Sequence, residues 1–140
     1  MAALGRHNIV AFVPICDVSS ATTFYADTLG LKLVRDEQPF SLVFDANGIM
    51  LRLAITHEVR PASWTVLGWD VPDIRAAVCA LGSAGVHFER YAPLEQDEYG
   101  IWTSPGGARV AWFKDPDGNV LSLSEFPASP PAASSAAELA

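Results

Sequence analysis

The sequence contains few side chains that can do chemistry, and two of them are charged residues on predicted strands. Arg52 carries a planar guanidinium group, which can hold a ligand carboxylate or phosphate through paired hydrogen bonds. Asp70 can contact a ligand or pair with Arg52 across a cavity, and both interpretations stay open. An aspartate beside an arginine stays ionised and is a weak base, so a metal-independent enzyme that uses this pair is the least favoured alternative.

Two tryptophans and one cysteine are the other candidates. Trp102 and Trp112 can stack on a planar or cationic ligand, although tryptophan more often serves packing alone. Cys16 follows a predicted strand, but a nucleophilic thiol needs an activating base or cationic surroundings, and no histidine lies near it in the sequence. A Ser-His-Asp order, a glycine-rich phosphate loop and a Cys-x-x-Cys pair are all missing. These residues favour a binding site over a nucleophilic one.

Two predicted hairpins position these residues. Asp117-Gly118 lies between apolar runs at residues 110–113 and 120–123, and Asn47-Gly48 lies between similar runs at 42–44 and 49–53. Asp-Gly and Asn-Gly are strong hairpin signals, because the glycine tolerates the positive φ that the turn requires. The hairpin is therefore duplicated.

The segments before each hairpin are duplicated too. Residues 9–15 predict a strand, Asp17 caps a predicted helix that ends at Gly30, and two strands lead to the first hairpin turn. A second strand at 64–69, a helix that has Pro72 near its start and ends at Gly85, a strand at 86–90 and a long segment at 91–107 lead to the second hairpin. The predicted class is α+β, with two βαβββ modules at about 8–56 and 63–126. Residues 127–140 are of low complexity and predict a disordered tail.

Two motifs resemble those of the vicinal oxygen chelate superfamily, which includes glyoxalase I, bleomycin-resistance proteins and extradiol dioxygenases. The first motif is Phe24-Tyr-Ala-Asp-Thr-Leu-Gly-Leu31, and the second is Asp115-Pro-Asp-Gly-Asn119. With the repeat, the resemblance covers roughly residues 8–126. It implies a curled mixed sheet around a shared cavity, and it implies a homodimer.

The resemblance also implies four metal-ligand positions, which histidine or glutamate occupies in the enzymes of that family. In this sequence they fall on Val10, Arg52, Val66 and Ser122. Valine has no lone pair to offer, arginine is a permanent cation and serine is a poor ligand for such metals. The other candidates lie in the linker, at the start of an edge strand or at odd offsets along strands: His57, His87, His7 and Glu125. The sequence therefore predicts no metal and no cofactor.

Strand alternation predicts which side chains share the cavity face with these four positions. The face is apolar and aromatic with few polar groups, which is typical of small-molecule sites. The predicted ligand-binding residues are Phe12, Leu42, Met50, Arg52, Val66, Asp70, Trp102, Trp112 and Ser122.

Composition limits the partners and the location. Half of the 140 residues are hydrophobic, but no run approaches the roughly 20 that cross a bilayer, and residues 1–126 suit one domain. No secretory signal is visible and only two cysteines occur, so we expect a cytoplasmic protein without a membrane partner. The formal charge of −7 argues against nucleic acid and favours a neutral or cationic ligand.

The sequence thus predicts a metal-independent, small-molecule-binding protein, and the resemblance implies that it is a homodimer. The resemblance suggests sequestration of an antibiotic or a toxicant. A metal-dependent lyase or dioxygenase, as in glyoxalase I, is the alternative.

Overall fold

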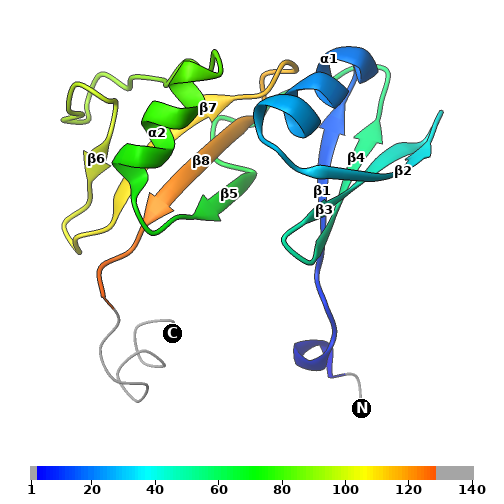
Figure 1. The fold of residues 1–140 in the computed structure, drawn as a ribbon, viewed down its shortest axis with the longest axis horizontal. Coiled ribbons are helices and arrows are strands. Elements are labelled where there is room, and N and C mark those ends of the chain that lie inside the picture. Colours follow the sequence, from blue (N-terminus) through cyan, green and yellow to red (C-terminus); the bar gives the residue numbers. More distant parts are fainter. Residues whose placement is uncertain (1–2, 129–140) are drawn as a thin grey trace.

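Two four-stranded sheets lie side by side in the computed structural model of this chain (Figure 1). The structure describes residues 3–128, so the predicted tail at 129–140 lies outside the described residues. The sheets have the orders β1-β4-β3-β2 and β5-β8-β7-β6, and the first strand of each module runs parallel to the last. The strands are Val10–Ile15 (β1), Lys32–Glu37 (β2), Ser41–Ala46 (β3), Ile49–Ile55 (β4), Leu67–Asp70 (β5), Trp102–Thr103 (β6), Arg109–Lys114 (β7) and Val120–Glu125 (β8). The predicted α+β class is confirmed.

Each module has one helical segment, and both segments begin at an aspartate. α1 (Val18–Thr22) continues as a π-helical turn, η2 (Thr23–Thr28), whereas α2 (Ile74–Ser83) is a regular helix. Asp17 accepts a hydrogen bond from the Ser20 amide at 3.0 Å, and Asp73 accepts one from the Ala76 amide at 3.1 Å. These side chains satisfy amides that have no partner inside the helix. A short 3-10 helix, η1 (Leu4–Arg6), precedes β1, and no helix within residues 3–128 is long and apolar enough to cross a membrane.

The two modules differ in the strand that follows the helix. The prediction of a strand at 86–90 is wrong, because this segment forms only an isolated bridge, between Phe88 and Phe113. The chain then turns back through residues 91–101, and the Gln96 amide holds this turn by donating to the carbonyls of Glu89 (2.9 Å) and Gly100 (2.8 Å). The edge beside β7 is therefore shared between Phe88 and the two-residue strand β6.

The turn between β7 and β8 joins the two modules through a buried hydrogen-bond network. The Tyr25 hydroxyl of the first module donates to Asp115 Oδ2 at 2.7 Å. The side-chain nitrogen Nδ2 of Asn119 donates to the same oxygen and to the Pro14 carbonyl of β1, each at 2.8 Å. Burial, and then the charge of Asp115, raises the pKa of Tyr25 far above its ordinary value, so the phenol stays protonated.

A second set of contacts comes from Asp117 in the same turn. Its Oδ1 accepts hydrogen bonds from the amides of Cys16 (3.1 Å) and Asp17 (3.3 Å), where β1 ends and α1 begins. Its Oδ2 is buried and has no hydrogen-bond partner among residues 3–128. The turn between β7 and β8 therefore links the two modules through hydrogen bonds.

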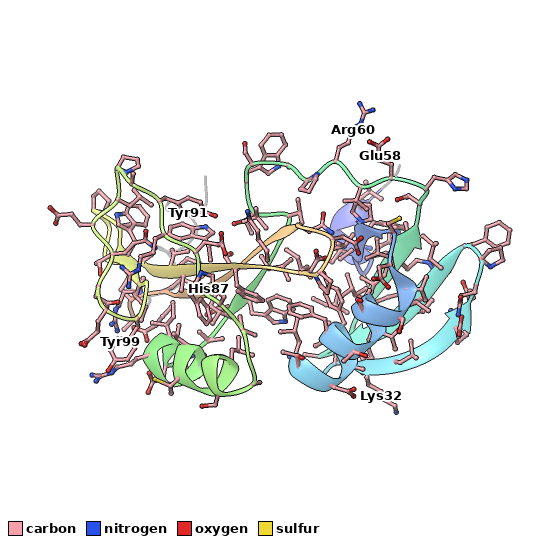
Figure 2. The ribbon with its side chains drawn as sticks, turned by 90° about the horizontal axis from the view of Figure 1, so that it is seen from above. Lys32, Glu58, Arg60, His87, Tyr91 and Tyr99 are labelled. Atoms are coloured by element: carbon pink, nitrogen blue, oxygen red, sulfur yellow. The ribbon has the colours of Figure 1, made fainter. Side chains whose placement is uncertain are left out.

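Both helical segments lie on one side of the two sheets (Figure 2). The core lies under them and is continuous across the modules; its largest fully buried side chains include Tyr25, Phe44, Phe113, Ile15, Leu51, Leu53, Ile74 and Leu121. In the described part of the chain, the opposite face of each sheet carries no helix, and we call these faces the first and second open faces. The first open face carries Val10, Phe12, Val43, Met50 and Arg52, and the second carries Gly68, Asp70, Val110, Trp112, Ser122 and Ser124.

Candidate functional site

The first open face is apolar around a partly exposed ion pair. Phe12 is level with Arg52 in the parallel register of β1 and β4, and Val10 is level with Met50. The guanidinium of Arg52 pairs with Glu37, with 2.9 Å between Nη2 and Oε1. The internal partner of Arg52 is thus Glu37 of the same sheet, whereas Asp70 lies on the other sheet.

Leu42 does not belong to this face, and its predicted inward position is wrong. It pairs with Leu53 and is 1% exposed in the core under the helices, whereas Val43 lies opposite Arg52. The first hairpin has a two-residue turn, Asn47-Gly48, which pairs Ala46 with Ile49. A shift of one residue in register moves every side chain to the other face of a strand. The second hairpin has a five-residue turn, so its register did not correctly predict the face of Leu42 in the first hairpin.

The second open face carries a row of aromatic rings. Trp112 lies opposite Ser122, as predicted, and Trp102 lies opposite Val110 at the sheet edge. The ring centroids of Tyr91 and Trp112 are 5.4 Å apart in an edge-to-face arrangement, and those of Trp102 and Trp112 are 6.1 Å apart. Figure 2 shows Tyr91 on the side of β7 away from α2. The rings of Tyr91 and Trp112 border a cavity of about 220 Å³, which is also lined by Ser63, Trp64, Thr65 and Val120.

Polar groups on this face are few and placed between the rings and β5. Ser122 is only 6% exposed, and its Oγ would lie 2.8 Å from a Cβ added at Gly68. Gly68 thus leaves the space that the Ser122 hydroxyl occupies. Asp70 lies level with Ser124 and is exposed. Burial, and then the charge of Glu89, raises the pKa of Tyr91, so this phenol is a neutral donor.

The four positions at which the resemblance implies metal ligands lie on the two open faces or at their edge. Val10 and Arg52 are on the first open face, Ser122 is on the second, and Val66 precedes β5 with its amide bonded to the Val120 carbonyl. Within residues 3–128, no group of three or more His, Cys, Asp or Glu side chains is arranged to hold a metal ion. One hydroxyl, two valines and a cation paired with a carboxylate are not a donor set for a divalent metal. The residues present therefore do not fit the metal of the family's enzymes.

Cys16 has no activating partner in the described part of the chain. Its thiol is exposed and donates to the His57 carbonyl at 3.4 Å, so it faces a backbone group and not an imidazole. Without a base or a cation beside it, the thiol has no feature of a nucleophile.

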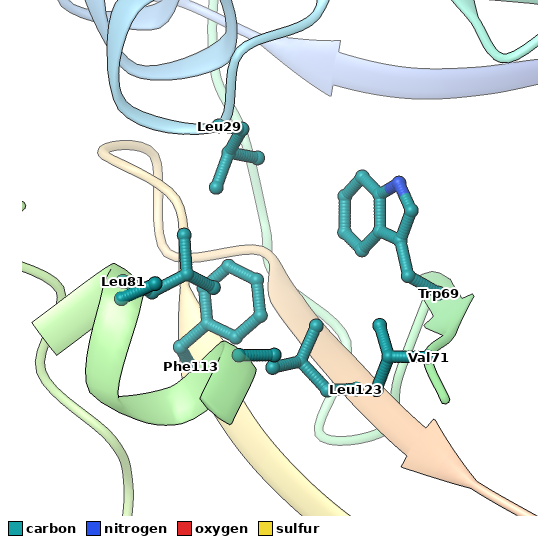
Figure 3. A pocket seen from close by; sticks show the side chains of 8 residues that line it. Leu29, Trp69, Val71, Leu81, Phe113 and Leu123 are labelled. Atoms are coloured by element: carbon teal, nitrogen blue, oxygen red, sulfur yellow. The ribbon is translucent and has the colours of Figure 1, made fainter. Parts of the chain in front are cut away.

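A separate apolar pocket lies on the helix side, between η2 and α2 (Figure 3). Its volume is about 270 Å³, and it is lined by Leu29, Trp69, Val71, Ala77, Ala80, Leu81, Phe113 and Leu123. The rings of Trp69 and Phe113 stack at 6.2 Å to form one wall. Because these side chains offer almost no polar group, the pocket cannot orient a reacting molecule.

The sequence did not predict two residues that contact the predicted site: Glu37, which pairs with Arg52, and Tyr91, whose ring lies against Trp112. Glu37 was absent from the predicted set because a β-bulge in β2 decides which way it points. Tyr91 was absent because it lies in the long segment that was assigned no regular structure. Its only signal was an aromatic residue early in the segment that leads to Trp102.

Comparison with known proteins bears out the resemblance. Residues 7–123 match the family model of the Glyoxalase/Bleomycin resistance protein/Dioxygenase superfamily. A solved structure of a member of this superfamily from Sphaerobacter thermophilus is 26% identical, with a TM-score of 0.66 over 85% of this chain and 96% of that chain. No curated protein matches the sequence.

Two further solved structures share the fold at lower identity. A glyoxalase/bleomycin resistance protein/dioxygenase from Alicyclobacillus acidocaldarius is 20% identical, with a TM-score of 0.63 over 86% of this chain and 92% of that chain. A lactoylglutathione lyase from Agrobacterium tumefaciens is 17% identical, with a TM-score of 0.64 over 85% and 93% of the two chains. With two βαβββ modules and a family match over most of its length, this chain belongs to the glyoxalase/bleomycin resistance protein/dioxygenase superfamily.

Proposed function

We propose that this protein binds a small, partly aromatic molecule on the open faces of its sheets and does so without a metal. The observation that carries the proposal is the position of Trp112, which borders the 220 Å³ cavity with Tyr91 and Trp102 beside it. Flat rings of this kind provide apolar contact area, and the Ser122 hydroxyl and Arg52 guanidinium provide the few polar groups that fix orientation.

Metal independence rests on the chemistry of the four ligand positions. Val10 and Val66 have no lone pair, Ser122 is a weak donor, and Arg52 repels a divalent cation. Sequestration of an antibiotic or another toxic compound suits such a site, because it requires affinity and an enclosed cavity but no reacting group. The alternative is a metal-dependent lyase or dioxygenase, which the experiment below also tests.

We further propose that the site is enclosed by a second copy of this chain. The first open face exposes large apolar side chains, with Phe12 65%, Val10 42% and Met50 38% accessible. The two open faces belong to sheets that share no backbone ladder, so neither encloses a ligand alone. Association of two copies through these faces removes the apolar side chains from water, which is favourable by about 25 cal/mol per Å² of apolar surface.

Ligand binding is tested by titrating naphthalene- and quinoline-sized aromatic compounds while tryptophan fluorescence is recorded. We expect saturable quenching in the wild-type protein and about a fivefold weaker affinity in Trp112→Phe, since a lost stacking contact is worth about 1 kcal/mol. Trp69→Phe is the matched control, because Trp69 lines the pocket on the helix side. Equal weakening by both variants would contradict a site on the second open face.

The same preparation decides between the metal-free and metal-dependent alternatives. Protein purified without chelators or an affinity tag should contain no stoichiometric metal, and Ni²⁺, Zn²⁺, Mn²⁺ or Fe²⁺ should leave its thermal unfolding temperature unchanged. About one tightly held ion per chain would overturn the proposal and favour a lyase or a dioxygenase.

A further inference from the structure

The edge strand β2 contains a bulge that changes which of its side chains reach the first open face. Leu33 pairs with Phe44, but Arg35 pairs with Val43, so Val34 is an extra residue in the ladder. In a regular strand Arg35 would share the face of Leu33 and point toward the core side. The bulge turns Arg35 to the open face, and re-aiming a side chain is a common use of bulges beside binding sites.

Glu37 follows Arg35 on the same face and lies between two guanidinium groups. Its Oε2 accepts a hydrogen bond from Arg35 Nε at 3.0 Å. Its Oε1 accepts from Arg52 Nη2 at 2.9 Å and Nη1 at 3.3 Å, and from Ser41 Oγ at 3.4 Å. The side chains of Arg35, Glu37 and Arg52 are 53%, 35% and 25% exposed, so solvent and ligands can reach all three.

This cluster has unused capacity for an anion. The two guanidinium groups have ten N–H donors in all, about five in each, whereas the cluster makes three arginine-to-glutamate contacts. One carboxylate between two arginines leaves one positive charge without a partner in the cluster. That charge lies next to Phe12 on an apolar face of a chain whose formal net charge is −7.

We propose that Arg35 and Arg52 bind the carboxylate group of the ligand, with Glu37 as a positioning residue that holds both guanidinium groups in place. The inference rests on the proposed binding function and names the chemical class of the ligand as an aromatic monocarboxylate. One unpaired positive charge matches a monoanion, and the planar fork of a guanidinium matches a carboxylate. The net negative charge of the whole chain favoured a neutral or cationic ligand. The cluster of two arginines and one glutamate on the first open face is instead positive, and it favours an anion.

Matched pairs of probes test this inference by calorimetry. Each pair consists of an aromatic carboxylate and its neutral amide, for example 1-naphthoate and 1-naphthamide, and 1-naphthyl phosphate serves as the dianionic comparison. We expect the carboxylate to bind at least tenfold more tightly than the amide. We expect this preference to shrink to less than threefold in Arg35→Gln and in Arg52→Gln, and to weaken with added salt.

Arg60→Gln is the matched control, because Arg60 is also paired with a glutamate, Glu58, but on the linker (Figure 2). This variant loses the same charge and should keep the full preference for the carboxylate. A general effect of net charge would instead appear in all three arginine variants and would overturn the inference.

The remaining outcomes distinguish a failure of the carboxylate site from a failure of the proposed binding of aromatic molecules. Equal affinity for carboxylate and amide would overturn the carboxylate site but leave aromatic binding intact. Tighter binding of the phosphate than of the carboxylate would assign the cluster to a dianion and would also overturn it. If neither member binds in any of several such pairs, the proposed binding function itself is wrong.

Discussion

Tyr25 is the residue on which contact between the modules depends most directly. It is fully buried, and its hydroxyl donates to Asp115 in the turn of the other module. Removing the donor of a buried, charged acceptor costs more free energy of unfolding than removing the donor of an exposed acceptor. The phenol is therefore a structural donor, and its ionisation would place two negative charges side by side.

Tyr25→Phe should lower the free energy of unfolding by about 2 kcal/mol, because it leaves the buried carboxylate of Asp115 with one donor fewer. Urea denaturation monitored by circular dichroism measures this change. Tyr99→Phe is the control, since it also removes a hydroxyl hydrogen bond, but one that the Tyr99 oxygen accepts from the exposed Arg75. A loss in Tyr25→Phe no larger than in the control would show that the turn is held by other contacts.

The same variant has a defined pH dependence. The folded pKa of Tyr25 is raised above its ordinary value of 10.0, so its contribution to stability is complete below pH 10 and declines as the pH rises further. The difference in stability between the wild type and Tyr25→Phe should fall by about 1.4 kcal/mol per pH unit above 10, where only the unfolded phenol ionises. A difference that stays constant from pH 8 to pH 11 would contradict the raised pKa.

The hairpins show how elements of the same type acquire different roles. Gly48 and Gly118 both have a φ of 88°, in the left-handed region that favours glycine. A Cβ at Gly48 would meet nothing within 4 Å, whereas one at Gly118 would lie 3.0 Å from Pro61 Cγ in the linker. The first turn is free, and the second is packed against the chain that connects the modules.

Gly48→Ala should lower the free energy of unfolding by about 1 kcal/mol through backbone strain alone. Gly118→Ala should lower it by about 2 kcal/mol, because the added methyl group also crowds Pro61. Thermal or urea unfolding of the two variants side by side measures the difference. Equal losses would show that the linker moves aside at no cost.

Elements were predictable where neighbours in the sequence determine them. The Asp17 cap and the Asn47-Gly48 turn depend on a few adjacent residues, and both are confirmed. The face of Leu42, the bulge at Val34 and the pairing of Arg52 with Glu37 were not predictable. Each depends on the register between strands, and one extra residue in a turn or a strand inverts it without any local signal.

At the scale of the whole molecule, the helices of residues 3–128 leave one side of both sheets without a helix over it. The apolar side chains there include Phe12 and Val10 on β1 and Met50 on β4. The charges of Arg35 and Arg52 and the rings of Trp102 and Trp112 lie on the same uncovered side, on different sheets. A second copy would place ligand, charges and rings in one enclosed volume.

Phe12→Asp should dissociate the proposed homodimer, raising its dissociation constant by about 100-fold or more, since an unpaired charge in an apolar interface costs several kcal/mol. Analytical ultracentrifugation over a range of concentrations measures this. Ala76→Asp is the control, because it adds the same charge to the exposed surface of α2 on the other side of the sheets. A wild-type protein that stays monomeric at all concentrations would contradict the dimer.

The network around Asp115 and Asn119 has a consequence for how the two halves of the chain depend on their connection. The hydrogen bonds that join the modules come from the second hairpin turn, β1 and Tyr25, whereas the covalent link, residues 56–66, touches that turn at Pro61. That segment acts chiefly as a tether, which gives each half a millimolar effective concentration of the other, on the order expected for short linkers. Two half-length chains with the same surfaces would form the same contacts as a bimolecular complex, and fusion makes their association independent of expression level.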